Sequence, residues 1–199
     1  MIGIIDYGAG NLESVQKALT YLGVESRIVG QPDALECCRG LILPGVGNFG
    51  AAVQTLHRNG LFPEIKAWLE QDRPFLGICL GMQLLFQNSE ESPAAEGFGI
   101  LSGEVVWLKT PKIPHIGWNG VRVIRAGDLW DGIPNESFFY FLHSFIAQPG
   151  ESEPILAQTD YYGDFPVVFN RGRIYGVQFH PEKSGRIGLR LLNNWSRLC

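Results

Sequence analysis

The stretch Pro74-Phe-Leu-Gly-Ile-Cys-Leu-Gly-Met-Gln-Leu-Leu-Phe-Gln87 decides the fold of this chain. An apolar run, typical of a buried strand, ends in Gly77-Ile-Cys79-Leu-Gly81 and leads into a run of helical character. A Gly-x-nucleophile-x-Gly turn between a strand and a helix is a nucleophile elbow, whose glycines remove the Cβ clashes of a sharp turn. The following helix would direct the positive end of its dipole at the sulfur. A small buried cysteine at a strand end is the competing interpretation.

Strands and helices alternate upstream of this stretch. Apolar runs predict strands at Met1–Asp6, Glu25–Val29, Gly40–Leu43 and Phe75–Ile78. Helices are expected after a capping Asn11, over about 13 residues from Ala51, and at Glu64–Gln71. This alternation predicts a parallel sheet with right-handed crossovers, whose active site lies at the carboxyl ends of the strands.

The second half of the chain has a different pattern. Strands without long helices between them are predicted at Glu104–Leu108, Val121–Ile124, Ser137–Leu142, Pro166–Asn170 and Arg173–Val177. Arg171-Gly172 is expected to be the turn of a hairpin, and Gly185–Leu198 a final helix. The predicted fold class is therefore α/β: a central, mostly parallel sheet flanked by helices, with additional antiparallel strands in the second half. The length suits a single domain over residues 1–199.

The composition is that of an ordinary globular protein, with 45% hydrophobic and 18% charged residues. A net charge of −4 and the lack of any lysine and arginine cluster argue against binding to nucleic acid. No apolar run is long enough to cross a membrane, and the first residues do not resemble a signal peptide. The four cysteines have neither a disulfide nor a zinc-binding spacing, which predicts a cytoplasmic setting and no metal.

A thiol nucleophile needs a base, and His180-Pro-Glu182 offers one. The two side chains are two positions apart, so in an extended segment held by Pro181 they would point the same way. Glu182 could then accept the imidazole N–H and leave the other ring nitrogen facing the sulfur of Cys79. Taken alone, the motif favours a capping histidine and a solvated acid; its place at the end of an apolar strand, in an α/β chain with a Gly-flanked cysteine, favours the catalytic pair.

An oxyanion hole is the third requirement of this chemistry. One donor would be the N–H of Leu80, the residue after the nucleophile. The other would come from Pro44-Gly45-Val46-Gly47, whose glycines allow a close approach to a carbonyl oxygen. A glycine-rich turn without a catalytic role is the alternative.

Together these motifs resemble the class I (triad) glutamine amidotransferases. The opening Ile4-Ile5-Asp6-Tyr7-Gly8-Ala9-Gly10-Asn11-Leu12, with His115-Ile116-Gly117-Trp118-Asn119 and His143-Ser144-Phe145, narrows the resemblance to the glutaminase subunits of imidazole glycerol phosphate synthase. The resemblance covers the whole chain. It implies that Cys79 attacks the carboxamide of L-glutamine, that His180 relays the proton to ammonia, and that Glu182 orients His180.

The resemblance also implies residues that bind glutamine. Gln83, one turn beyond the nucleophile, resembles a residue on the glutamine side of the pocket. Glu91 would meet the α-ammonium group, with a solvated loop acid as the alternative. The backbone of His143, Ser144 and Phe145 resembles the segment that grips the α-carboxylate. Many relatives have tyrosine where Phe145 stands, so this chain lacks that hydroxyl.

A partner follows from the same resemblance. The ammonia would pass to a cyclase subunit with a (β/α)₈-barrel fold, which makes imidazole glycerol phosphate and an aminoimidazole carboxamide ribotide in histidine biosynthesis. The loop carrying Pro114, His115, Trp118 and Asn119 would face this partner in a heterodimer, with Trp118 as an anchor; an ordinary core tryptophan is the alternative. No cofactor is implied. Because the Gly45–Gly47 loop can adopt more than one orientation, the isolated chain is expected to be a weak glutaminase.

Two other functions remain open on the sequence alone. One is the amidotransferase subunit of another synthase, such as those of pyridoxal phosphate, anthranilate or GMP. The other is a non-catalytic scaffold subunit of this fold. Copurification with a barrel subunit would test the first, and alkylation of Cys79 blocked by glutamine would test the second.

Overall fold

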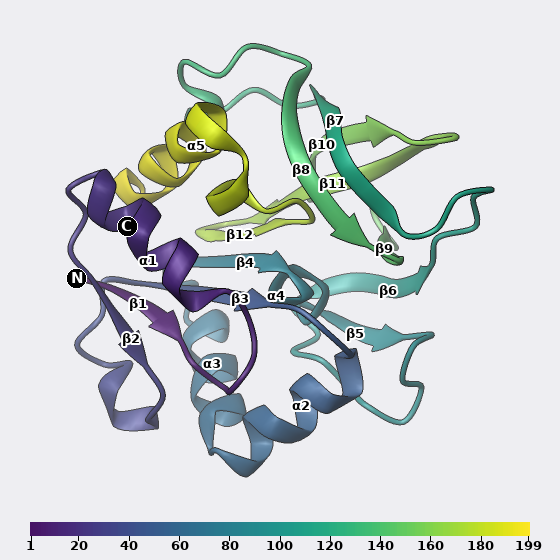
Figure 1. Ribbon diagram of the computed structural model, residues 1–199. Helices are drawn as coiled ribbons and strands as arrows, with labels where there is room; N and C mark the ends of the chain where they lie inside the picture. The colour runs from purple at the N-terminus through teal and green to yellow at the C-terminus, as the bar shows by residue number, and fades with distance from the viewer.

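The computed structural model describes residues 1–199, and its core is one large mixed sheet (Figure 1). The strands of this sheet are β1 (Ile2–Ile5), β2 (Ser26–Val29), β3 (Gly40–Gly45), β4 (Phe75–Cys79), β7 (His115–Val123), β8 (Ser137–His143), β10 (Ile155–Asp160), β11 (Asp164–Arg171) and β12 (Ile174–Val177). Their order is β2-β1-β3-β4-β12-β11-β10-β7-β8. The strands from β2 to β12 pair in parallel and the rest are antiparallel, as the predicted fold class required.

Helices cover both faces of the parallel part of the sheet. They are α1 (Leu12–Tyr21), α2 (Phe49–Arg58), α3 (Leu61–Glu70), α4 (Leu80–Gln83) and α5 (Gly185–Arg197). In Figure 1, α1 and α5 lie above the sheet, whereas α2 and α3 lie below it. A second sheet, of β5 (Phe86–Ser89), β6 (Leu101–Trp107) and β9 (Phe145–Pro149), lies beside the antiparallel part.

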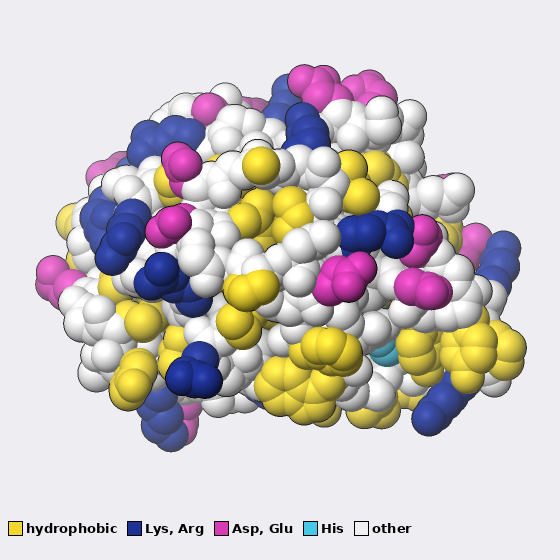
Figure 2. All heavy atoms as spheres, turned by 90° about the horizontal axis from the view of Figure 1, so that it is seen from above, with side chains coloured by type: hydrophobic (Ala, Val, Ile, Leu, Met, Phe, Trp, Pro, Cys, Tyr) yellow, Lys and Arg dark blue, Asp and Glu magenta, His cyan; other side chains and the backbone are white.

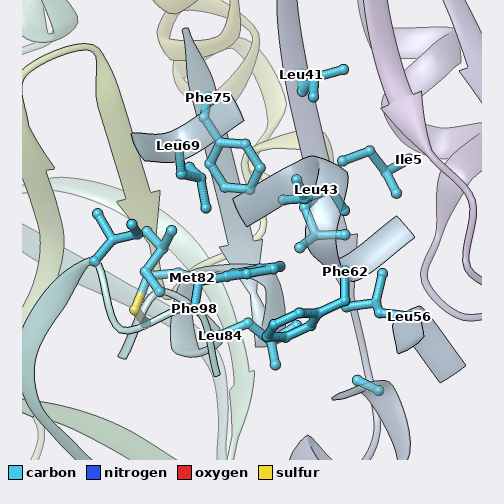
Figure 3. Close-up of a cluster of buried hydrophobic side chains, with 14 of the residues drawn as sticks. Ile5, Leu41, Leu43, Leu56, Phe62, Leu69, Phe75, Met82, Leu84 and Phe98 are labelled. Atoms are coloured by element: carbon cyan, nitrogen blue, oxygen red, sulfur yellow. The ribbon is translucent and has the colours of Figure 1, made fainter. Parts of the chain in front are cut away.

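The two cores follow from the alternation of side chains along the parallel strands. Leu41 and Leu43 of β3 point to the core under α2 and α3, together with Phe75 of β4 (Figure 3). Their neighbours Ile42 and Leu76 point to the other core, under α1 and α5. All five side chains are fully buried, so these strands are apolar at every position.

Several predicted elements differ from those observed. The two helices predicted from Ala51 and at Glu64–Gln71 are both present, but the boundary between them lies earlier, because Gly60 has a φ of 68° and separates α2 from α3. The helix after Cys79 has only 4 residues, since the chain enters β5 at Phe86. Asn11 precedes α1 but makes no side-chain capping bond.

The antiparallel half contains more strand than predicted. Strands β9 and β10 were missed, and the Trp118 segment, predicted as a loop, is the middle of β7. The hairpin is confirmed: β11 and β12 pair in antiparallel fashion across Gly172, which has a φ of 57°. In the whole molecule, no helix is both long and apolar enough to span a membrane.

The elbow after β4 has no room for side chains at its two glycines. Cys79 itself has the unusual backbone angles φ 54° and ψ −109°. A Cβ atom on Gly77 would lie 2.5 Å from the carbonyl oxygen of Gly81, and one on Gly81 would overlap the carbonyl oxygen of Leu43. The glycines thus allow the turn at Cys79, as predicted, and they also allow the close contact of α4 with β3.

We expect Gly81→Ala to lower the free energy of unfolding by roughly 3 kcal/mol, because the backbone of β3 cannot move away from the new methyl group. Urea denaturation monitored by circular dichroism measures the change. Gly127→Ala is the matched control, since nothing lies within 4 Å of a Cβ atom at Gly127. Equal stability of the two variants would contradict this account of the elbow.

Candidate active site

Cys79 lies at the carboxyl end of β4, in the middle of the sheet. It is buried, with 6% of its surface exposed. Its sulfur lies 3.8 Å from the side-chain nitrogen of Gln178, which donates to it, and 3.8 Å from the carbonyl oxygen of Leu142. Cys79 thus belongs to the core under α1 and α5, but its sulfur contacts polar groups of β8 and of the residue that follows β12.

His180 and Glu182 form a buried pair close to Cys79. His180 Nδ1 donates to Glu182 Oε1 over 2.8 Å, and neither side chain is more than 2% exposed. The geometry differs in one respect from the prediction: Pro181–Lys183 form a 3₁₀ turn and not an extended segment. The turn curls the carboxylate back onto the imidazole, so the pairing predicted from the sequence is formed by a different backbone.

Ser184 holds this turn against β8, and sequence reasoning missed it. Its hydroxyl donates to the carbonyl oxygen of His180 over 2.6 Å and accepts the N–H of Tyr140 over 3.0 Å. The N–H of His180 in turn donates to the carbonyl oxygen of Tyr140 over 2.9 Å. The position of the imidazole is therefore fixed by backbone bonds to β8 as well as by Glu182.

The environment of His180 favours its protonated form. Burial lowers its pKa, but the sulfur of Cys79 and the carboxylate of Glu182 outweigh burial and raise the pKa to about 10. Nδ1 is bonded to Glu182, whereas Nε2 has no hydrogen-bond partner in the protein. An imidazolium whose Nε2 proton is free can pass that proton to a leaving group.

The glycine loop predicted as part of the oxyanion hole lies against the elbow. Gly45 ends β3 and is the register partner of Cys79. A Cβ atom on Gly45 would lie 2.9 Å from the Cβ of Leu80, so the two segments touch. Val46 is 41% exposed, and Gly47 has a φ of 100°. The structure thus places Gly45 of this loop against Leu80, the other residue predicted for the oxyanion hole.

Tyr7 is a further residue at this loop that the sequence did not single out as functional. A Cβ atom on Gly45 would lie 2.7 Å from its hydroxyl, which is buried and has no hydrogen-bond partner in the protein. Burial raises the pKa of Tyr7, and the nearby Cys79 raises it further. Tyr7 therefore packs against the loop as a neutral phenol.

Gln83 is buried and bonded to protein groups. Its side-chain nitrogen donates to the carbonyl oxygen of Phe145 over 3.0 Å and to Gln178 Oε1 over 3.4 Å. Gln178, only 1% exposed, was missed by sequence reasoning, although it directly follows the strand that leads to His180. The two amides connect the sulfur of Cys79 to the backbone at the start of β9.

Glu91 lies at the N-terminus of α2. Its Oε2 accepts the N–H of Phe49 over 2.7 Å, and the hydroxyl of Ser92 accepts the N–H of Gly50 over 3.1 Å. These bonds satisfy two of the free N–H groups at the start of α2, the helix that follows the glycine loop. The observed bonds thus give the carboxylate a structural use, beside which its predicted contact with an α-ammonium group remains a prediction.

The segment of His143, Ser144 and Phe145 joins the two sheets. His143 ends β8 and is buried, and Phe145 begins β9. The carbonyl oxygen of Ser144 accepts the N–H of Leu108 over 2.9 Å. The ring of Phe145 packs edge-on against Trp107, with the ring centroids 4.9 Å apart, so the phenyl group lies in an aromatic contact.

The residues predicted to face a partner divide into two groups. Trp118 is 55% exposed, and Asn119 beside it is partly exposed. His115 is only 2% exposed and lies between the rings of Phe141 and Tyr161, so its prediction as a surface contact was wrong. The reason is the alternation of a strand, which points Trp118 outward and His115 inward.

An exposed apolar row runs along β7 and β8. Its members are Ile116 and Trp118 of β7 with Leu142 and Phe138 of β8, all between 37% and 60% exposed. The register pairs Ile116 with Leu142, which places the row on one face. Figure 2 looks down on the side of the molecule that carries these strands in Figure 1 and shows hydrophobic patches among charged side chains.

Two buried histidines, His115 and His143, lie on the opposite face of β7 and β8 from this row. Burial lowers the pKa of His115 to about 4. Burial also lowers the pKa of His143, to about 3, with smaller effects of the same sign from His115 and His180 and an opposing one from the carbonyl of Phe145. Both rings are therefore neutral at physiological pH, in contrast to His180. No group of three or more histidine, cysteine, aspartate or glutamate side chains in the structure could hold a metal ion.

A family comparison agrees with this geometry. The model of the class-I glutamine amidotransferase family matches residues 3–196. The chain therefore belongs to the class-I glutamine amidotransferase family. Within it, the chain is similar to proteins named imidazole glycerol phosphate synthase subunit HisH. The relative from Geobacillus kaustophilus is 48% identical over 98% of this chain and 95% of its own, and that from Methanocaldococcus jannaschii is 46% identical over the full length of both.

Solved structures support the fold. A structure described as a glutamine amidotransferase has a TM-score of 0.80 at 21% identity, over 99% of this chain and 97% of its own. The structure of PurLQS from Thermotoga maritima also has a TM-score of 0.80, at 18% identity, over 98% and 96%. The family and fold predicted from the sequence motifs are thus confirmed.

We expect the free energy of unfolding to fall as the pH is lowered from about 6.5 towards 4. In this window the unfolded chain takes up protons on His115 and His143, whereas the folded rings stay neutral because their pKa values are about 4 and about 3. Each histidine adds a slope of at most about 1.4 kcal/mol per pH unit. Urea denaturation of the wild type and of His115→Phe across this range measures the difference. Identical slopes would contradict the depressed pKa of His115.

Proposed function

We propose that this chain is the glutaminase subunit of an imidazole glycerol phosphate synthase, with residues 1–199 acting as one amidotransferase domain. It hydrolyses L-glutamine to glutamate and ammonia and delivers the ammonia to a cyclase subunit. The observation that carries the proposal is the buried pair of His180 and Glu182, joined over 2.8 Å, next to Cys79 at the elbow. The similarity to the HisH relatives over the full chain supports the choice of synthase.

The proposed reaction begins with attack of the Cys79 sulfur on the carboxamide carbon of glutamine. The N–H groups of Leu80 and of the Gly45–Gly47 loop stabilise the negative charge on the oxygen of the tetrahedral intermediate. When the C–N bond breaks, His180 Nε2 gives its proton to the leaving ammonia, and a glutamyl thioester remains. Losing one oxyanion donor typically costs about 2.7–4 kcal/mol of transition-state stabilisation.

The second half of the reaction reverses the role of His180. Now neutral at Nε2, it takes a proton from a water molecule, and the resulting hydroxide attacks the thioester carbonyl. The C–S bond breaks, glutamate leaves, and Cys79 is regenerated as a thiolate beside the imidazolium. Glu182 keeps its bond to Nδ1 throughout. It thereby stabilises the imidazolium at each stage at which Nε2 carries a proton.

The partner proposed for this chain is a cyclase subunit with a (β/α)₈-barrel fold. The apolar row on β7 and β8 is the surface that suits it, because an exposed row of large apolar side chains marks a site of protein association. The row adds Ile116, Phe138 and Leu142 to the interface predicted from Pro114, Trp118 and Asn119. The cyclase would combine the ammonia with a phosphoribulosyl aminoimidazole nucleotide.

The function is tested by glutamine hydrolysis and by labelling of the thiol. We expect a glutamine-like electrophile to alkylate Cys79 and glutamine to block the reaction. The purified chain should hydrolyse glutamine slowly, and addition of the barrel subunit with its nucleotide should raise the rate. Cys79→Ala should abolish hydrolysis under both conditions.

Other results would contradict specific parts of the proposal. Glutamine-dependent activity in Cys79→Ala would rule out the thioester mechanism. Full turnover by the chain alone would rule out activation by the partner. Stimulation by the glutamine-dependent partner of another synthase, and not by the cyclase, would reassign the chain to another member of the family.

We expect Trp118→Ala to weaken binding to the barrel subunit about 30-fold, the effect of losing about 2 kcal/mol at an aromatic anchor of an interface. Isothermal titration calorimetry measures the dissociation constant. Tyr21→Ala is the control, because Tyr21 is a 78% exposed aromatic on α1 and lies outside the apolar row. The same affinity in both variants would show that the row does not contact the partner.

A further inference from the structure

A chain of buried polar contacts runs from β7 to the sulfur of Cys79. It begins at Asn119, whose side-chain nitrogen lies 3.3 Å from His115 Nε2, and continues from His115 Nδ1 to His143 Nε2 over 3.0 Å. His143 Nδ1 then donates to the carbonyl oxygen of Phe145 over 3.0 Å. That oxygen also accepts a hydrogen bond from the side-chain nitrogen of Gln83, which donates to Gln178 as well. The side-chain nitrogen of Gln178 in turn donates to the sulfur of Cys79.

The contacts fix the protonation of both histidines. The carbonyl oxygen of Phe145 can only accept, so His143 carries its proton on Nδ1 and, being neutral, accepts at Nε2. His115 must then donate from Nδ1, and its Nε2 is an acceptor for the amide of Asn119. Both rings are therefore Nδ1–H tautomers, and each donates in the direction of Cys79.

Further contacts hold Asn119 and His115 in place. Asn119 cannot turn its amide around, because its nitrogen also donates to the carbonyl oxygen of Asp160 over 2.8 Å and its oxygen accepts the N–H of Gly120 over 2.8 Å. The ring of His115 is stacked between Tyr161 at 3.9 Å and Phe141 at 4.5 Å. The two histidines are also direct register partners of β7 and β8.

The chain ends in the segment expected to bind the substrate. The Phe145 carbonyl is bonded from one side by His143 and from the other by Gln83, so its position depends on both. Without the donor from His115, His143 Nε2 would be a buried acceptor without a partner, a state that proteins avoid by moving or reprotonating the group. Either response disturbs the bond between His143 and Phe145.

We propose that His115 and His143 are positioning residues: as a pair of neutral Nδ1–H tautomers they fix the Phe145 carbonyl and link strand β7 to the glutamine pocket. The inference rests on the proposed function for the identity of the substrate and of the partner. Strand β7 also carries Trp118 of the apolar row, so a partner that docks there contacts the strand from which the chain of hydrogen bonds begins. In this role the two imidazoles act through the Phe145 carbonyl and not through a contact of their own with the substrate.

Two substitutions at His115 separate the hydrogen bond from the packing. His115→Phe keeps an aromatic ring between Phe141 and Tyr161 but removes both ring nitrogens. His115→Asn loses the stacking but places an amide nitrogen where Nδ1 was, so it can still donate to His143 Nε2. If His115 serves only to pack the core, His115→Phe should disturb glutamine binding less than His115→Asn. If His115 is a positioning residue, His115→Asn should disturb glutamine binding less than His115→Phe.

The readouts are the tautomers and the affinity for glutamine. In the wild type, ¹⁵N NMR of the imidazoles should show both rings protonated at Nδ1 and unprotonated at Nε2. The concentration of glutamine that protects Cys79 from alkylation, and KM with the barrel subunit present, should rise about tenfold in His115→Phe. In His115→Asn both should stay within about threefold of the wild type, and kcat should change less than KM in each variant.

Asn119→Asp provides a second test at a partly exposed position, should His115→Phe not fold. It replaces the donor facing His115 Nε2 by a carboxylate oxygen, so that Nε2 becomes protonated in the NMR spectrum and glutamine protection weakens. Unchanged tautomers and protection in this variant would overturn the proposal, as would a milder effect for His115→Phe than for His115→Asn. If glutamine fails to protect Cys79 even in the wild type, the proposed function fails, whereas the tautomers still test the hydrogen-bonded pair.

Discussion

The parallel pairing of β4 with β12 is the contact on which the site depends. It places Val177 beside Ile78, so that the two strands end level and the residues that follow them meet: Cys79 from one, Gln178 and His180 from the other. Gln178 lies 99 positions from Cys79 in sequence, yet no loop has to be ordered to bring the two together. The pairing of β3 with β4 adds the glycine loop to the same edge by the same means.

Sequence patterns were sufficient for the parts of the molecule that obey local rules. The elbow, the glycine loop and the His180–Glu182 pair were predicted from short motifs of glycine, cysteine, histidine and glutamate. The buried parallel strands were predicted from continuous apolar runs. The helix after Cys79 was predicted too long because Leu84, Leu85 and Phe86 suit a helix and a strand equally well, and tertiary pairing decides between them. Strands β9 and β10 were missed because each has an apolar run of only three residues, 145–147 and 155–157, which is followed by polar residues or proline.

Residues that act through another side chain gave no signal in the sequence. His115 was assigned to the surface because it stands next to Trp118 in a motif, and only the register of β7 shows that the two point in opposite directions. Gln178 and Ser184 are ordinary polar residues until the fold brings them to Cys79 and to the backbone of His180. The chain uses three histidines near one thiol in two ways: His180 is charged by a paired carboxylate, and the other two are kept neutral by burial.

The position of β8 has a consequence for how a cell must make this protein. It is the terminal strand of the large sheet, and it carries Phe138 and Leu142 on its exposed face. The backbone of its outer edge is covered at Tyr140 by His180 and Ser184, but its exposed apolar side chains can associate with any chain that they meet, including another copy. The surface that suits docking is therefore also an aggregation hazard, and the hazard grows with every copy that lacks a partner. Balanced synthesis of the two subunits would protect the chain during and after folding, quite apart from any effect on the rate of catalysis.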